Sequence, residues 1–363
     1  MHPHQVSLTF KQDKNDIPIE NNTNPNQTEE ETEFLPKGTP LPVIPQNTPL
    51  FKNTIPFYKE MEKHVLEEYG PQFSLDESYP LEVKTTTYGK VNKRYKQPVH
   101  KHNTSYPQHL MLAMIHATPN QVQNIIDMRK TWCQKKYASV FGFKCIFILV
   151  RQTVQKSHKV DYFKTMNQTT KDIYFIDMPF LEEKWTTLQQ KDISSFIYLY
   201  PIFDNYKYYV RFDNHVVVNI EMLCDVLNEL PSEATVVGRL MEHRPIADTK
   251  QRYFDKMAQV LKKYYMFVPG HVAAFTNDLA KFFGKWSLYY QLTPTSLEDT
   301  TFGFLIYRFA MEKHMMINFV QPEKWGNGHS GQYGNFIIFH RAHNQINITE
   351  YFNRCVQDGH FVN

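Results

Sequence analysis

Two short stretches in the second half of the chain combine acidic and basic side chains at spacings that suit metal binding or proton transfer. The first, Asp213-Asn214-His215, places a carboxylate and an imidazole two residues apart. An oxygen and a nitrogen ligand on one loop suit Mn²⁺ or a similar divalent cation. The same pattern is also typical of an Asx-turn beside a surface histidine, so alone it is weak evidence for a metal site.

The second stretch, Glu298-Asp299, precedes an apolar run at residues 304–311. Adjacent carboxylates before a helix usually cap it or complement its dipole, and this segment alone favours that interpretation. A carboxylate that points into a binding site can instead take a proton from a substrate hydroxyl.

Two further residues have both a structural and a functional interpretation. His340 follows the apolar residues 337–339, where a histidine is more often packed or at the surface than a metal ligand. Arg129 lies in a helix-like stretch, where it belongs either to an ordinary amphipathic helix or to a phosphate-binding site.

The elements that must position these residues alternate between short apolar strands and helical stretches, which predicts crossover units and a mostly parallel sheet. The chain is therefore expected to have an α/β fold. In such sheets ligands bind beyond the carboxyl ends of the strands, and Asp213 directly follows one of them. The predicted strands cover residues 110–115, 144–150, 172–177 and 207–212, and the predicted helices cover 120–136 and 184–200.

Composition divides the 363 residues into three parts. Residues 1–50 are rich in Asn, Pro, Gln, Thr and Glu and are expected to be disordered or stalk-like. Residues 51–107 are expected to form an irregular N-terminal extension, and residues 108–363 the folded domain.

Charge and cysteine content exclude several classes of protein. The net charge of +3 and the scattered basic residues argue against a nucleic-acid-binding protein. No stretch approaches the roughly 20 apolar residues that span a bilayer, and no signal peptide is recognisable. The four cysteines predict free thiols in the core, with one or two disulfides as the alternative.

In chain order, the segments resemble the β-1,3-galactosyltransferase and β-1,3-N-acetylglucosaminyltransferase family of inverting enzymes, which includes the fringe-type enzymes. Arg211-Phe-Asp213-Asn214-His215 corresponds to its Lys-x-Asp-Asp-Asp metal loop, and residues 298–303 match its Glu-Asp-Val-x-x-Gly motif. The resemblance covers about residues 108–345. Its other segments are residues 128–132, 145–150, 185–191 and 270–279.

The resemblance implies a GT-A fold, a Rossmann-like sheet that binds a UDP-sugar, with Mn²⁺ bridging the diphosphate. It implies that Asp299 deprotonates the acceptor hydroxyl. The implied metal ligands are Asp213, His215 and His340, and the implied donor-binding residues are Arg129, Asp213, Asn214, Gly270 and Glu298.

The chain departs from the family pattern at the metal loop, where His215 and Asn214 replace two aspartates. Losing two carboxylates weakens the attraction for a hard cation, although an imidazole still binds Mn²⁺. Val272 replaces the second family glycine.

The expected function is transfer of galactose or N-acetylglucosamine from a UDP-sugar to a sugar hydroxyl of a glycan, glycoprotein or glycolipid, with inversion and a β-1,3 linkage. One alternative is a binding or structural protein on a decayed glycosyltransferase scaffold. A second is another α/β nucleotide-binding enzyme. The family implies a Golgi membrane protein, whereas no anchor is visible, so a soluble form and an incomplete N-terminus both stay open.

Overall fold

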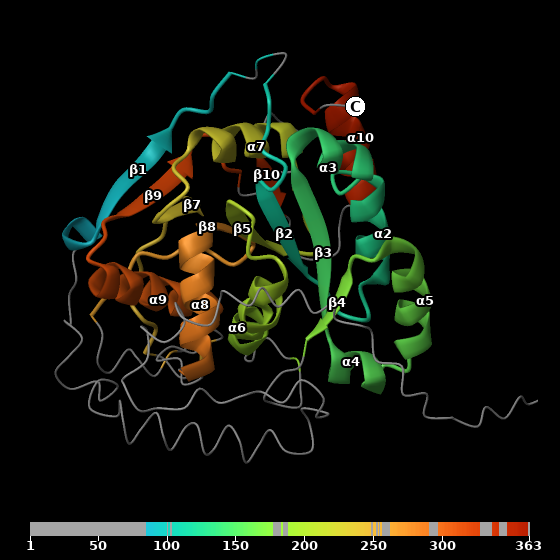
Figure 1. Cartoon of the computed structure of the whole chain (residues 1–363), viewed down its shortest axis with the longest axis horizontal. Helices are drawn as coiled ribbons and strands as arrows, with labels where there is room; N and C mark the ends of the chain where they lie inside the picture. Colours follow the sequence, from blue (N-terminus) through green and yellow to red (C-terminus); the bar gives the residue numbers. More distant parts are fainter. Residues whose placement is uncertain are drawn as a thin grey trace, which may run out of the picture. The chain divides into compact units, whose positions relative to one another are not determined.

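A central eight-stranded sheet organises the computed structural model, with strand order β1-β9-β7-β8-β5-β2-β3-β4 (Figure 1). Neighbouring strands run parallel except at β8, which is antiparallel to both β5 and β7. The predicted α/β fold with a Rossmann-like, mostly parallel sheet is confirmed. The strands are β1 (Gly89–Tyr95), β2 (Met111–His116), β3 (Phe143–Val150), β4 (Ile173–Ile176), β5 (Tyr208–Asp213), β7 (Thr235–Gly238), β8 (Val272–Thr276) and β9 (Ile317–Pro322).

The structure describes residues 85–99, 101, 104–176, 183, 188–247, 250–251, 253, 255, 262–289, 297–326, 336–340 and 347–361. The segment 1–50 therefore lies outside the described residues, as do residues 51–84 of the expected N-terminal extension. The division of the chain at residues 50 and 107 stays a prediction.

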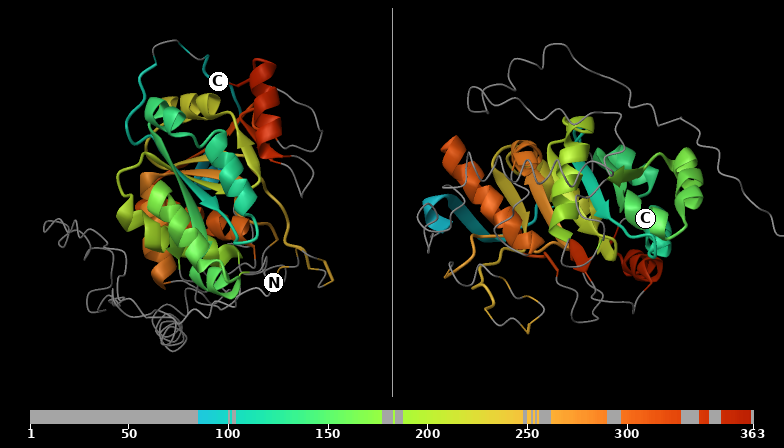
Figure 2. Two further views of the ribbon diagram at one scale, coloured as in Figure 1. Left: turned by 90° about the vertical axis from the view of Figure 1, so that its right-hand side faces the viewer. Right: turned by 90° about the horizontal axis from the view of Figure 1, so that it is seen from below.

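Helices cover both faces of the sheet (Figures 1 and 2). One apolar core includes side chains of α2, α3, α7 and α10, and the other includes side chains of α6, α8 and α9. The helices are α2 (Val122–Lys130), α3 (Lys135–Phe141), α4 (Arg151–Lys156), α5 (Val160–Thr170), α6 (Leu188–Leu199), α7 (Ile220–Glu229), α8 (Asn277–Tyr289), α9 (Glu298–Lys313) and α10 (Ile348–Gln357), with short 3₁₀ turns at Thr85–Thr87 and Tyr200–Ile202.

Strand β2 shows why the inner strands are continuous apolar runs. Met111, Ala113 and Ile115 belong to one core, whereas Leu112 and Met114 belong to the other. Because both faces of the strand are buried, residues 111–115 are all apolar, as is typical of a parallel sheet covered by helices, and only the last residue, His116, is polar.

Two register relations position the residues of interest. In the pairing of β2 with β5, His116 lies opposite Asp213, so the carboxyl ends of these strands meet. A separate two-stranded sheet joins β6 (Val216–Val218) to β10 (Ile338–His340), and there His340 lies opposite Val216. Residues far apart in the sequence are thereby brought to one end of β5.

The helix expected at residues 120–136 is confirmed for Val122–Lys130, which form α2, but it ends before residue 136, and a separate helix, α3, begins at Lys135. Trp132 lies in the break and is fully buried, with its indole nitrogen donating to the carbonyl of Val216 at 3.3 Å. Placing this side chain in the core requires the backbone to leave the helical path.

The irregular structure expected up to residue 107 is wrong for residues 89–95. This segment forms β1, an edge strand that pairs parallel with β9. Most of its side chains are exposed, so it lacks the apolar pattern that identified the inner strands.

The expectation of free thiols is wrong for Cys133 and Cys145, which form a disulfide that encloses α3. Cys224 and Cys355 are free and buried, as expected. Gly142 ends α3 with φ +66°, and a Cβ there would lie 1.8 Å from the carbonyl oxygen of Pro107. The position therefore requires glycine.

Among the described residues, no helix has both the length and the apolar character needed to cross a membrane.

The disulfide should contribute measurably to stability. Replacing both Cys133 and Cys145 by serine is expected to lower the free energy of unfolding by about 2–3 kcal/mol, because the unfolded chain loses a cross-link across a 12-residue separation. Urea unfolding measures the change. A reducing agent should destabilise the wild type to the same extent and leave the double variant unchanged; an effect on both proteins would contradict the assignment.

Candidate functional site

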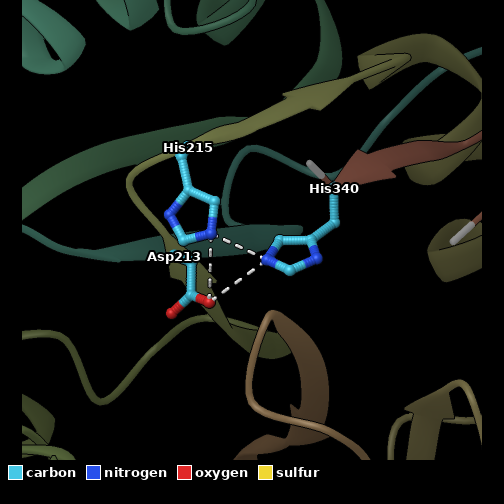
Figure 3. Close-up of side chains that lie close together, drawn as sticks. All are labelled: Asp213, His215 and His340. Carbon is cyan, nitrogen blue, oxygen red and sulfur yellow. Dashed lines mark hydrogen bonds and ion pairs between the residues drawn. The ribbon is translucent and has the colours of Figure 1, made fainter. Parts of the chain in front are cut away.

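Asp213, His215 and His340 lie together at the end of β5 (Figure 3). The Nε2 atoms of the two histidines are 2.7 Å apart. Asp213 Oδ2 lies 3.9 Å from Nε2 of His215 and 3.7 Å from Nε2 of His340. One potential ligand atom from each residue thus faces a common point, and all three side chains are partly exposed.

The local fold explains this convergence. Asp213 is the last residue of β5, and the turn that follows presents His215 before the chain enters β6. Because β10 pairs with β6, the register sets His340 beside that turn. Three residues that the sequence suggested as metal ligands are therefore neighbours, although their role stays a prediction.

His271, which sequence reasoning missed, stacks on His340 with ring centroids 4.7 Å apart and an interplanar angle of 25°. Its carbonyl accepts a hydrogen bond of 3.0 Å from the Asp213 amide, so it contacts two residues of the cluster. Burial, reinforced by the neighbouring His340, lowers the pKa of His271 to about 3, which keeps its ring neutral. The only signal in the sequence for His271 was its position directly after Gly270.

Asn214 was expected to face the donor, but its side chain is buried. Its amide nitrogen donates to Gln121 Oε1 at 2.6 Å, and Gln121 is held in turn by Thr118. Asn214 Oδ1 lies 3.4 Å from Nδ1 of His215. Asn214 therefore supports the His215 ring from the protein interior.

Beneath the cluster, Arg211 is almost completely buried and forms an ion pair with Asp192 of α6. Its Nε donates to Asp192 Oδ1 at 2.9 Å, and Nδ1 of His116 lies 2.8 Å from the same oxygen. Burial alone would raise the pKa of Asp192, but Arg211 and then His116 bring it below its ordinary value. Asp192 is thus a buried carboxylate that stays ionised.

The guanidinium of Arg211 also faces the acids of the cluster and of α9. Its Nη1 lies 3.3 Å from Asp213 Oδ1, and its Nη2 lies 3.9 Å from Glu298 Oε1. A Cβ on Gly270 would lie 2.3 Å from Nη1 and 2.6 Å from Asp299 Oδ1. Gly270, expected to contact the donor, therefore makes room for Arg211 and Asp299.

Of the two structural roles expected for Glu298 and Asp299, capping is wrong, because Leu297 occupies the N-cap of α9, whereas placement near the positive end of the helix dipole is confirmed. Both acids lie in the first turn instead. Asp299 Oδ1 is enclosed and has no hydrogen-bond partner among the described residues. Burial and then the adjacent Glu298 raise the pKa of Asp299 well above its ordinary value, and burial raises the pKa of Glu298 to about 7.

Arg129, expected near the nucleotide, is not joined to the cluster. Its guanidinium binds Asp172, with Nε 2.9 Å from Oδ2, and donates to Thr170 at 3.1 Å. It also lies over the ring of Phe147 at 5.1 Å. These contacts attach α2 to the segment just before β4. They give Arg129 a structural role that requires no bound phosphate.

Comparison with known proteins decides the family. A family model described as galactosyltransferase matches residues 123–316, more than half of the chain. The chain belongs to the galactosyltransferase family. The predicted resemblance is confirmed, and the matched region is a glycosyltransferase domain. His340 lies beyond the residues that the galactosyltransferase match covers.

A search of the curated proteins finds no match. Among solved structures, this galactosyltransferase-family chain is similar to a 4-diphosphocytidyl-2C-methyl-D-erythritol synthase from Anaerococcus prevotii. The similarity has 11% sequence identity and a TM-score of 0.32, and it covers 59% of this chain and 87% of that chain.

Removing Arg211 should destabilise the fold strongly. Arg211→Met is expected to lower the free energy of unfolding by about 3–5 kcal/mol, because Asp192 stays buried without its cation. In a double-mutant cycle, Arg211→Met with Asp192→Asn should cost about 1–3 kcal/mol less than the sum of the single changes.

Denaturant unfolding measures all three variants. As the matched control, Lys263→Met breaks the exposed pair with Glu242 and should cost about 0.2–1 kcal/mol. Simple additivity at Arg211 and Asp192 would show that the two residues do not stabilise each other.

The raised pKa of Glu298 predicts a pH-dependent stability. The folded protein binds a proton at Glu298 more readily than the unfolded chain, so this contribution is complete at low pH and is lost as pH rises through about 7. With chelator present, Glu298→Gln should therefore flatten the decrease in melting temperature between about pH 5 and pH 8. The exposed Glu323→Gln is the control, and a profile identical to the wild type in Glu298→Gln would refute the prediction.

Proposed function

We propose that this galactosyltransferase-family chain is a metal-dependent, inverting hexosyltransferase. It transfers galactose or N-acetylglucosamine from a UDP-sugar to a sugar hydroxyl of a glycan, glycoprotein or glycolipid and forms a β-1,3 linkage. Family membership supports glycosyl transfer. Donor, linkage and stereochemistry come from the motif resemblance at residues 211–219 and 298–303.

The observation that carries the proposal is the placement of Asp299 beside Arg211 and Asp213. Arg211 Nη1 lies 3.3 Å from Asp213 Oδ1, and Nη1 and Asp299 Oδ1 both pack closely against Gly270. Both nitrogens Nη1 and Nη2 and the oxygen Oδ1 are enclosed without hydrogen-bond partners among the described residues. Two donors and one acceptor that make no hydrogen bond could bind a ligand hydroxyl, which accepts from one group and donates to the other.

The roles of the chain's own residues follow from this arrangement. Asp299 accepts the proton of the acceptor hydroxyl as that oxygen attacks the anomeric carbon. Attack from the face opposite UDP inverts the anomer. The positive charge of Arg211 interacts favourably with both Asp213 and Asp299 and so limits the repulsion between the two acids.

Asp213, His215 and His340 would hold Mn²⁺ or a similar divalent cation. One carboxylate oxygen and two imidazole nitrogens facing a common point are a suitable donor set. When bound, the cation offsets the negative charge that develops on the departing diphosphate.

The proposed location is the secretory pathway, and the Golgi in particular. The family supports this location, as does the Cys133–Cys145 disulfide, because disulfides persist in oxidising compartments.

Release of UDP from a panel of UDP-sugars tests the proposal, with Mn²⁺ or chelator and with simple sugar acceptors. Turnover with at least one donor, lost in chelator, is the expected result. No turnover with any donor, together with no rise in melting temperature on adding UDP, would overturn it in favour of a binding or structural protein on a decayed scaffold.

Asp299→Asn should reduce transfer by about 100- to 10,000-fold, because the amide cannot accept the proton. UDP affinity, measured by calorimetry, should stay unchanged. Asp161→Asn, on the exposed surface of α5, is the matched control and should keep full activity. Equal loss of transfer and of UDP binding would show that Asp299 is not the base.

A further inference from the structure

The cluster of Asp213, His215 and His340 contains two nitrogen ligands and only one carboxylate. We infer that it selects first-row transition ions over Mg²⁺ and Ca²⁺, and that His215 is the residue that determines this selectivity. The inference rests on the metal site of the proposed function and deepens it by naming the class of ion. It concerns binding by the protein alone, before any sugar nucleotide is present.

The chemistry of the donor set carries the first step. Mg²⁺ and Ca²⁺ bind oxygen ligands, and Mg²⁺ is usually held by one or two carboxylates together with substrate phosphates. Imidazole nitrogens favour Co²⁺, Ni²⁺, Cu²⁺ and Zn²⁺, with Mn²⁺ lowest in the affinity order. Co²⁺ and Zn²⁺ should therefore bind more tightly than Mn²⁺, and Mn²⁺ more tightly than Mg²⁺.

The local charge strengthens this preference. Asp213 is the one carboxylate of the cluster, and its Oδ1 lies 3.3 Å from Arg211 Nη1. A carboxylate that already faces a guanidinium attracts a hard cation less strongly, since part of its charge is neutralised. The contact between Asp213 and Arg211 does not weaken the two neutral imidazole ligands. The histidine nitrogens therefore contribute a larger share of the metal-binding energy than the carboxylate does.

The geometry needs only a small adjustment. At metal–nitrogen distances of about 2.0–2.1 Å, two ligands of a tetrahedral ion lie roughly 3.3 Å apart. The two Nε2 atoms are 2.7 Å apart and would separate by about half an ångström (Figure 3).

Supporting contacts hold both rings in a ligating orientation. Nδ1 of His215 faces Asn214 Oδ1, which directs Nε2 towards the cluster, and Asn214 is itself bound to Gln121. The ring of His340 stacks on His271, whose carbonyl also binds the Asp213 amide. Metal-binding histidines usually have a hydrogen-bond partner at the other ring nitrogen, as His215 has in Asn214, whereas the orientation of His340 is set by ring stacking.

Titration of the full-length, metal-depleted protein with Co²⁺ tests the inference, because ligand-field absorption reports binding directly and without sugar nucleotide. The expected Co²⁺ dissociation constant is at least about 100-fold below that of Mg²⁺ or Ca²⁺, with both measured by competition, and Zn²⁺ should displace Co²⁺. Equal affinity for Co²⁺ and Mg²⁺ would overturn the inference. The absence of any Co²⁺ spectrum would do the same and would leave the histidine contact as a hydrogen bond.

Variants identify the residue responsible. His215→Asp should lower the ratio of Co²⁺ to Mg²⁺ affinity by at least about tenfold, because an oxygen replaces a nitrogen ligand. His340→Ala, on a different strand, should also weaken Co²⁺ binding and serves if His215→Asp does not fold. His243→Asp makes the same exchange at an exposed histidine outside the cluster and should change nothing. An unchanged ratio in His215→Asp with native melting temperature would remove His215 from its assigned role.

The two proposals fail in different ways. Selective Co²⁺ binding without turnover of any UDP-sugar would support the inferred metal selectivity and refute the proposed transferase activity. Turnover supported equally by Mg²⁺ and Co²⁺, with equal affinities for both, would sustain the transferase and overturn the selectivity.

Discussion

The ion pair between Arg211 and Asp192 is the constraint on which the rest of the site depends. A guanidinium cannot be buried inside a sheet unless a carboxylate reaches it, and α6 supplies that carboxylate from one face. With Nε of Arg211 bound to Asp192, its Nη1 and Nη2 atoms determine where further carboxylates can lie close to the guanidinium. Asp213 and Glu298 lie beside them, and Gly270 leaves them room. The position of the polar site around Asp213 therefore depends on the buried ion pair between Arg211 and Asp192.

Strand β8, the one antiparallel strand of the eight-stranded sheet, has a comparable importance for the topology of the site. Strand β8 runs against both β5 and β7, so its first residues arrive at the edge where β2 and β5 end. A parallel strand at this position would place its beginning at the opposite edge. Because β8 is reversed, the residues just before it lie at the site: His271 contacts His340 and Asp213, and Gly270 lies against Arg211.

The sequence predicted four of the eight strands, β2, β3, β4 and β5, from their short, mainly apolar segments, and it left β7, β8 and β9 unpredicted. It missed β1, whose exposed side chains carry no such pattern. It also suggested the three residues of the cluster, since Asp213 and His215 share a loop and the family resemblance implied His340. The contacts of Arg129 with Asp172 and of Asn214 with Gln121 could not be predicted from the sequence, because only packing brings these residues together. The disulfide was hidden for the same reason.

The pairing of β6 with β10 has a consequence for the order of events during synthesis. His215 and His340 are 125 residues apart, so His340 is synthesised well after His215. The strands of the large sheet up to β9 precede it, so a nascent chain can assemble its core before the cluster exists. A cation held by all three residues can therefore bind only after β10 has paired with β6.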